Sequence, residues 1–226
     1  MQAHPIEIYA AIKSEVAKKD AMDSEKIKKL IAMFEGHVDL SVIPSFTRLA
    51  IGLDTSESMR LTPLSDLGNQ LTCLEYAALT AFILYRKTNG HARVFAYDSA
   101  VRELMVGTTN PTFTSFIKAL YEVEPRHSVE VDDCCLIRSG HISGEEFDGF
   151  ITFVSGESDK GKQAIWDALS KYNNKHNQNA RAIIVCPGDV AACEHYDDTM
   201  PNYLYLGGIG PDQVDTILSF TEQTHV

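Results

Sequence analysis

Short, almost continuously apolar runs alternate with longer amphipathic stretches between residues 46 and 226. Residues 49–53 form the first run, which is typical of a strand buried on both faces of a sheet. A helical repeat of apolar residues follows between Leu67 and Phe82. Further strand-like runs occupy residues 94–97, 101–106, 150–154, 182–186 and 203–206. Because strands separated by helices favour parallel pairing, the sequence predicts an α/β fold with a doubly wound, mostly parallel six-stranded sheet.

Within this sheet we expect residues 49–53 to be central and residues 101–106 to fold back as an antiparallel edge. Residues 1–45 have a different pattern. A good N-cap residue, Asp23, precedes helical periodicity that ends near Phe34, and Pro44 marks a boundary. The sequence therefore predicts a helical extension or linker over residues 1–45 and one larger domain over residues 46–226.

The charge of the chain argues against direct binding of nucleic acid. The formal net charge is -11. Residues 1–45 carry six basic and seven acidic side chains, a net of -1, so the remaining -10 belongs to residues 46–226. Proteins that bind nucleic acid gain affinity by neutralising phosphates with clustered basic groups. An acidic chain is better suited to cations or to a basic partner surface.

The five cysteines show no CxxC spacing, and the N-terminus lacks the compact apolar region of a signal peptide. No apolar run approaches the length that a membrane span needs. We therefore expect free thiols, no membrane association and a cytoplasmic location.

Polar side chains with oxygen atoms follow the ends of several predicted strands. Asp54, Ser56 and Ser58 come directly after the first strand. The other such residues are Asp98, Asp132, Asp133, Ser155, Glu157, Asp159 and Asp189. Ligands of open α/β sheets bind outside the carboxyl ends of the strands, and hard divalent cations prefer oxygen ligands. A second interpretation is that the two serines cap the next helix and that Asp54 is a turn residue.

Residues 49–59, which contain the pattern Asp-x-Ser-x-Ser-Met, resemble the opening of the metal-ion-dependent adhesion site (MIDAS) of von Willebrand factor A domains. The rest of the chain resembles the branch of that family found in the Ro (SS-A) ribonucleoprotein autoantigens, which also carry a TROVE module. The stretches that carry this second resemblance are residues 93–98, 132–136, 147–153, 180–186 and 201–220. Residues 5–45 resemble the stretch that leads from the RNA-binding ring of that family into its A domain.

The resemblance implies a von Willebrand A, Rossmann-like fold and a non-enzymatic module that binds a protein partner through the metal edge. Small non-coding RNA would be bound only through a neighbouring helical-repeat ring. The implied metal ligands are Asp54, Ser56, Ser58 and Asp132, with Ser155 and Glu157 as further candidates. Mg²⁺ is the expected cofactor, with Mn²⁺ or Ca²⁺ as alternatives.

Two loops depart from the family pattern. The second metal loop of the family offers Thr before Asp-Cys, where this chain has Asp132 and Asp133. The third loop usually reads Thr-Asp-x-Glu, where this chain has Ser155 in place of the aspartate. A carboxylate has thus moved from one loop to the other, so we expect an altered site that still binds metal. The alternative is a decayed site in a metal-free structural domain that packs against the ring.

An enzymatic alternative is a divalent-dependent phosphohydrolase with Asp54 as nucleophile. Haloacid dehalogenase-like enzymes need a second aspartate two residues later, where this chain has Ser56. The sequence also contains no recognisable pairing of a nucleophile with histidine. We therefore expect no enzymatic activity.

Overall fold

The structure is a computed structural model of the 226-residue chain. It describes residues 5–17, 29, 32–34, 36, 47–64, 71–97, 100–104, 111–123, 132–156, 161–176, 178–188, 193–196, 200–210 and 212–222. The expected helix start at Asp23 and the expected boundary at Pro44 lie outside these residues.

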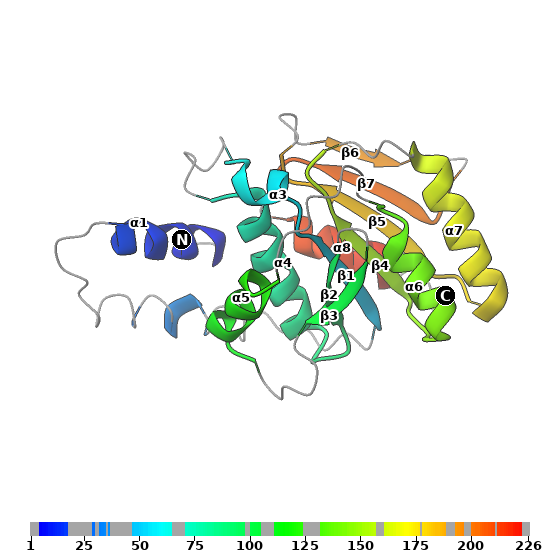
Figure 1. The fold of residues 1–226 in the computed structure, drawn as a ribbon, viewed down its shortest axis with the longest axis horizontal. Helices are drawn as coiled ribbons and strands as arrows, with labels where there is room; N and C mark the ends of the chain where they lie inside the picture. Colours follow the sequence, from blue (N-terminus) through cyan, green and yellow to red (C-terminus); the bar gives the residue numbers. More distant parts are fainter. Residues whose placement is uncertain are drawn as a thin grey trace.

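A single seven-stranded sheet forms the centre of the molecule, in the order β3-β2-β1-β4-β5-β7-β6 (Figure 1). The strands are β1 (Leu49–Asp54), β2 (Arg93–Tyr97), β3 (Val101–Leu104), β4 (Gly149–Phe153), β5 (Arg181–Cys186), β6 (Cys193–Tyr196) and β7 (Tyr203–Gly207). Strands β2, β1, β4, β5 and β7 are parallel to one another. The edge strands β3 and β6 are antiparallel to their neighbours.

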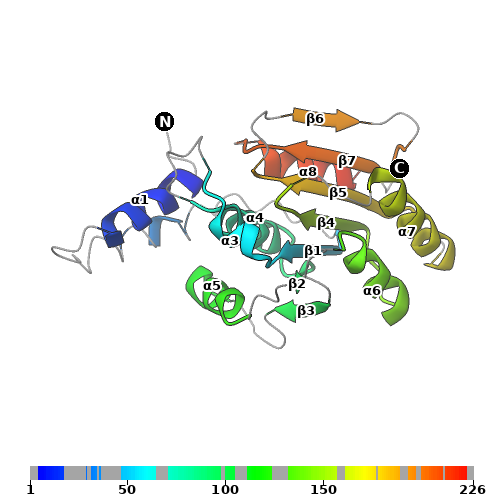
Figure 2. The same ribbon diagram turned by 45° about the horizontal axis from the view of Figure 1, so that its top comes forward.

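Helices cover both faces of the sheet. The helices are α1 (Pro5–Ala17), α3 (Glu57–Leu61), α4 (Cys73–Lys87), α5 (Phe113–Tyr121), α6 (Cys135–Ser143), α7 (Gly161–His176) and α8 (Gln213–Glu222). Helices α6 and α7 lie on the opposite side of the sheet from α4 (Figure 2). Alternate residues of β1 enter different cores, because Ile51 packs in the core with α4 and α8, whereas Ala50 packs in the core with α6 and α7.

The predicted fold class is confirmed, including the central position of β1 and the antiparallel edge formed by β3. The sheet has one strand more than the sequence predicted, namely β6. This segment reads Cys-Glu-His-Tyr and has no apolar run. An edge strand has one neighbour instead of two, so it can form with a polar sequence that gives no periodic signal.

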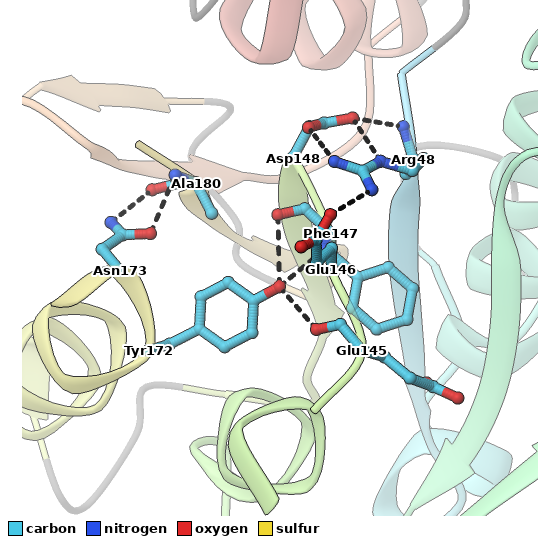
Figure 3. A network of polar contacts seen from close by, with 8 residues as sticks. All are labelled: Arg48, Glu145, Glu146, Phe147, Asp148, Tyr172, Asn173 and Ala180. Carbon is cyan, nitrogen blue, oxygen red and sulfur yellow. Dashed lines mark hydrogen bonds and ion pairs between the residues drawn. The ribbon is translucent and has the colours of Figure 1, made fainter. Parts of the chain in front are cut away.

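The amino edge of the sheet is closed by ion pairs and hydrogen bonds (Figure 3). Arg48 donates from its backbone to the Asp148 carboxylate over 2.7 Å, and its guanidinium lies 2.9 Å from Glu146 and 3.2 Å from Asp148. The Tyr172 hydroxyl of α7 donates to the Glu145 carbonyl over 2.8 Å and accepts from the Phe147 amide over 2.5 Å. These contacts hold the starts of β1 and β4 side by side. They thereby fix the register of the two strands, and both strands end at the opposite edge of the sheet.

The N-terminal segment shares its core with the α4 side of the domain. Ile8 and Ile12 of α1 belong to the same buried apolar cluster as α4 and α5. Phe34 is 1% exposed, and its ring centroid lies 5.0 Å from that of Phe113 and 6.3 Å from that of Phe82. The segment is thus packed as part of the domain core.

No helix of the described part of the chain is long and apolar enough to cross a membrane.

This packing predicts a large effect of Phe34→Ala on stability. Removing a buried aromatic ring costs about 3–5 kcal/mol, from lost burial and from the cavity left behind. We expect a loss of that size in the free energy of unfolding of the full chain, measured by urea denaturation. Met33 is the matched control, because its side chain is 50% exposed and Met33→Ala should change the free energy by less than about 0.5 kcal/mol. Equal stability of the two variants would contradict the shared core.

Candidate metal-binding site

The carboxyl edge of the sheet carries the candidate metal ligands. Asp54 is the last residue of β1 and is 1% exposed. One of its carboxylate oxygens accepts a hydrogen bond from the Ser56 amide over 2.8 Å. This bond closes the turn between β1 and α3, so Asp54 does act as the turn residue of the second interpretation. A carboxylate has two oxygens with several acceptor positions, so this bond leaves room for other interactions.

The helix-capping part of that interpretation is wrong for Ser56. Ser56 stands at the N-cap of α3, but its side chain makes no capping hydrogen bond. Its hydroxyl instead lies 2.9 Å from the Ser58 hydroxyl, which in turn donates to the Ser155 hydroxyl over 2.9 Å. Three hydroxyl oxygens, two from the start of α3 and one from the segment after β4, therefore meet beside the end of β1.

Asp132 and Asp133 lie in the loop before α6. Asp133 is 5% exposed, whereas the Asp132 side chain is 22% exposed. One Asp132 oxygen accepts from the Cys134 amide over 3.1 Å, and the other forms an ion pair with Arg138 of α6. The carboxylate expected to add charge to the metal site thus already has a cationic partner within the chain.

Tyr97, at the end of β2, is hydrogen-bonded to the residue before Ser56 and to the last residue of β4. Its carbonyl accepts from the Thr55 amide over 3.0 Å and from the Thr55 hydroxyl over 3.2 Å. Its own hydroxyl donates to the Phe153 carbonyl of β4 over 3.0 Å. The ring occupies the space over Gly52, where a Cβ atom would lie 3.2 Å from the ring carbons. Tyr97 is not among the residues predicted from the sequence, although a glycine inside a strand indicates that another group approaches it closely.

Negative charge gathers around the Tyr97 ring. The pKa of Tyr97 is raised well above its usual value, first by burial and then by the charges of Asp54, Asp133 and Asp132. The phenol therefore stays protonated, which its hydrogen bond to Phe153 requires. The pKa of the neighbouring Cys135 thiol is also raised, by burial and by the same two loop aspartates. A thiol with a raised pKa is a poor nucleophile.

The cysteines agree with the expectation of free thiols as far as they are described. Cys73, Cys134, Cys135 and Cys186 form no disulfide bond, and all except Cys135 are buried. Burial raises the pKa of the Cys73 thiol to about 11. The side chain of Cys193 lies outside the described residues.

The donor atoms at the carboxyl edge are of the kind that a hard cation prefers. Asp54, Ser56, Ser58 and Ser155 offer only oxygen atoms, as Mg²⁺ and Ca²⁺ prefer. Among the described residues, however, no group of three or more His, Cys, Asp or Glu side chains could hold a metal ion. Glu157 lies outside the described residues, as do Asp98, Asp159 and Asp189. The hydroxyls are thus brought together near the Asp54 carboxylate, whereas the Asp132 carboxylate is ion-paired with Arg138.

Known structures share this fold. The Ro (RSR) protein of Deinococcus radiodurans has a TM-score of 0.77 at 18% identity, over 99% of this chain and 45% of that protein. The conserved hypothetical protein BatB from Bacteroides thetaiotaomicron has a TM-score of 0.51 at 14% identity, over 78% of this chain and 97% of BatB. The chain therefore spans less than half of the length of the Ro protein. No curated protein sequence matches the chain.

The sequence family described as the Ro60 vWA domain matches residues 48–221, which begin at the arginine of the amino edge and end within α8. The match covers most of the chain and includes every strand of the sheet. The chain therefore belongs to the Ro60 family of von Willebrand A domains.

Proposed function

We propose that the chain is a non-enzymatic binding module of a Ro-like ribonucleoprotein that holds a divalent cation in a modified MIDAS. The observation that carries the proposal is the meeting of the Ser56, Ser58 and Ser155 hydroxyls beside the Asp54 carboxylate. Asp54, Ser56 and Ser58 would hold the ion, most readily Mg²⁺, with Mn²⁺ or Ca²⁺ as substitutes. Asp132 would add charge, and Ser155 and Glu157 would complete the ligand set.

The ligand chemistry suggests what the site binds. Serine hydroxyls are neutral, weak ligands, so an ion held mainly by them keeps most of its charge. Such an ion accepts a further carboxylate oxygen. A protein partner that presents an acidic side chain is therefore the proposed ligand. A basic loop on the same partner would be attracted by the net charge of -10 on residues 46–226.

The absence of catalysis is part of the proposal. A phosphohydrolase of the haloacid dehalogenase type that used Asp54 as nucleophile would need a second aspartate as acid and base at position 56, where this chain has Ser56. Asp54 itself is 1% exposed and holds the turn. The free thiols support a reducing, cytoplasmic environment.

The competing proposal is a metal-free structural domain that packs against an RNA-binding helical ring. The ion pair between Asp132 and Arg138 favours it, because that carboxylate is already compensated. Under both proposals, RNA would be bound by the ring and not by this domain.

Thermal unfolding with and without divalent ions separates the two proposals. An ion that binds only the folded state stabilises it by RT ln(1 + [L]/Kd), roughly 2.7 kcal/mol at a hundredfold excess over Kd. We expect Mg²⁺ or Mn²⁺ at millimolar concentration to raise Tm, Asp54→Ala to abolish the shift and Asp132→Ala to weaken it. Asp167→Ala, which removes an exposed carboxylate from α7, should leave the shift intact. No shift for the unmodified chain, with Asp54→Ala equally stable, would support the metal-free domain.

The chain by itself should not bind small structured RNA at physiological salt. The net negative charge of residues 46–226 repels phosphates, so binding would displace few of the cations condensed on the RNA. Titration of a labelled RNA at about 150 mM salt, with and without Mg²⁺, should give no saturable binding. Saturation at micromolar concentration or below would show that the domain itself carries an RNA surface.

A further inference from the structure

We propose that Arg138 competes with the divalent cation for the Asp132 carboxylate and so sets the metal affinity of the site. This inference rests on the proposed metal-binding function. In the absence of metal the guanidinium of Arg138 acts as the counterion of Asp132, and metal binding requires that it be released.

The contacts of Asp132 involve both oxygens of its carboxylate. The backbone amide of Cys134 binds one oxygen over 3.1 Å, and the guanidinium of Arg138 binds the other. Arg138 ends the first turn of α6, where its amide donates to the Cys134 carbonyl over 2.9 Å. The start of this helix thus supplies both donors to the Asp132 carboxylate.

The two partners differ in how easily they can move. The Arg138 side chain is 51% exposed, so its guanidinium can turn into water at little cost in solvation. The Asp132 side chain is 22% exposed and is held by the Cys134 amide at the start of α6. When this weak ion pair breaks, the arginine side chain therefore moves away. The Asp132 carboxylate stays in place.

Competition follows from charge. A guanidinium on Asp132 occupies an oxygen that the ion would use, and it places a positive charge next to an incoming divalent cation. Partly exposed ion pairs contribute little free energy. The effect on the dissociation constant of the metal is therefore limited to about two- to fivefold. This contribution lowers the metal affinity without abolishing binding.

The test is the dissociation constant for Mn²⁺, measured by calorimetry on the full chain, for the unmodified protein and for Arg138→Met. Methionine keeps a long apolar stem and removes the charge. We expect Arg138→Met to bind Mn²⁺ about two- to fivefold more tightly. A urea midpoint without metal that stays close to that of the unmodified chain would show that the variant is folded. Arg138→Gln serves as the second variant and should give the same direction.

A double-mutant cycle with Asp132→Asn tests whether the effect passes through Asp132. Asparagine cannot form the ion pair, so the gain from Arg138→Met should disappear in the Asp132→Asn background. If the gain persists there, the arginine acts only as a nearby charge and the proposal is wrong. Equal or weaker Mn²⁺ binding by Arg138→Met also overturns it, while the proposed metal site stands. If neither the unmodified chain nor any variant binds Mn²⁺, both the competition by Arg138 and the proposed metal site are overturned.

Discussion

Burial of β1 on both faces is the constraint on which the rest of the structure depends. All six residues of β1 are buried, and the strand lies between β2 and β4 inside the parallel part of the sheet. A strand in this position cannot shift its register without moving apolar side chains out of both cores. Asp54 is therefore held at the carboxyl edge, although a carboxylate is unfavourable in so buried a place unless polar partners compensate it.

Tyr97 supplies the connection between this strand and the candidate site. Because residue 52 is a glycine, the ring can lie across β1, and its hydroxyl reaches the Phe153 carbonyl of β4. The Tyr97 carbonyl also holds Thr55, which stands between Asp54 and Ser56. One buried residue thus fixes the spacing of the Ser56 and Ser155 loops. Burial raises the pKa of Tyr97, and the charges of the aspartates around the site raise it further.

The two edges of the sheet differ in how their charges are satisfied. At the amino edge, Arg48 is tied to Asp148 and Glu146, which closes that edge and stabilises the strand starts. At the carboxyl edge, hydroxyls bond mainly to one another, and Asp132 is compensated by an arginine that is half exposed. A ligand can rearrange the hydroxyl contacts of the carboxyl edge, because hydroxyl hydrogen bonds contribute little free energy each.

The sequence by itself determined the fold class, the central place of residues 49–53 and the position of Asp54, Ser56 and Ser58 at the end of the first strand. These features depend on local periodicity and on the burial that apolar runs require. Only the tertiary structure decided that β6 completes the sheet, that Phe34 packs in the domain core, that Ser58 meets Ser155 and that Arg138 pairs with Asp132. The first three join segments that are distant in the chain or carry no periodic signal. The last depends on which way two side chains turn at the start of a helix, and residue spacing does not encode that choice.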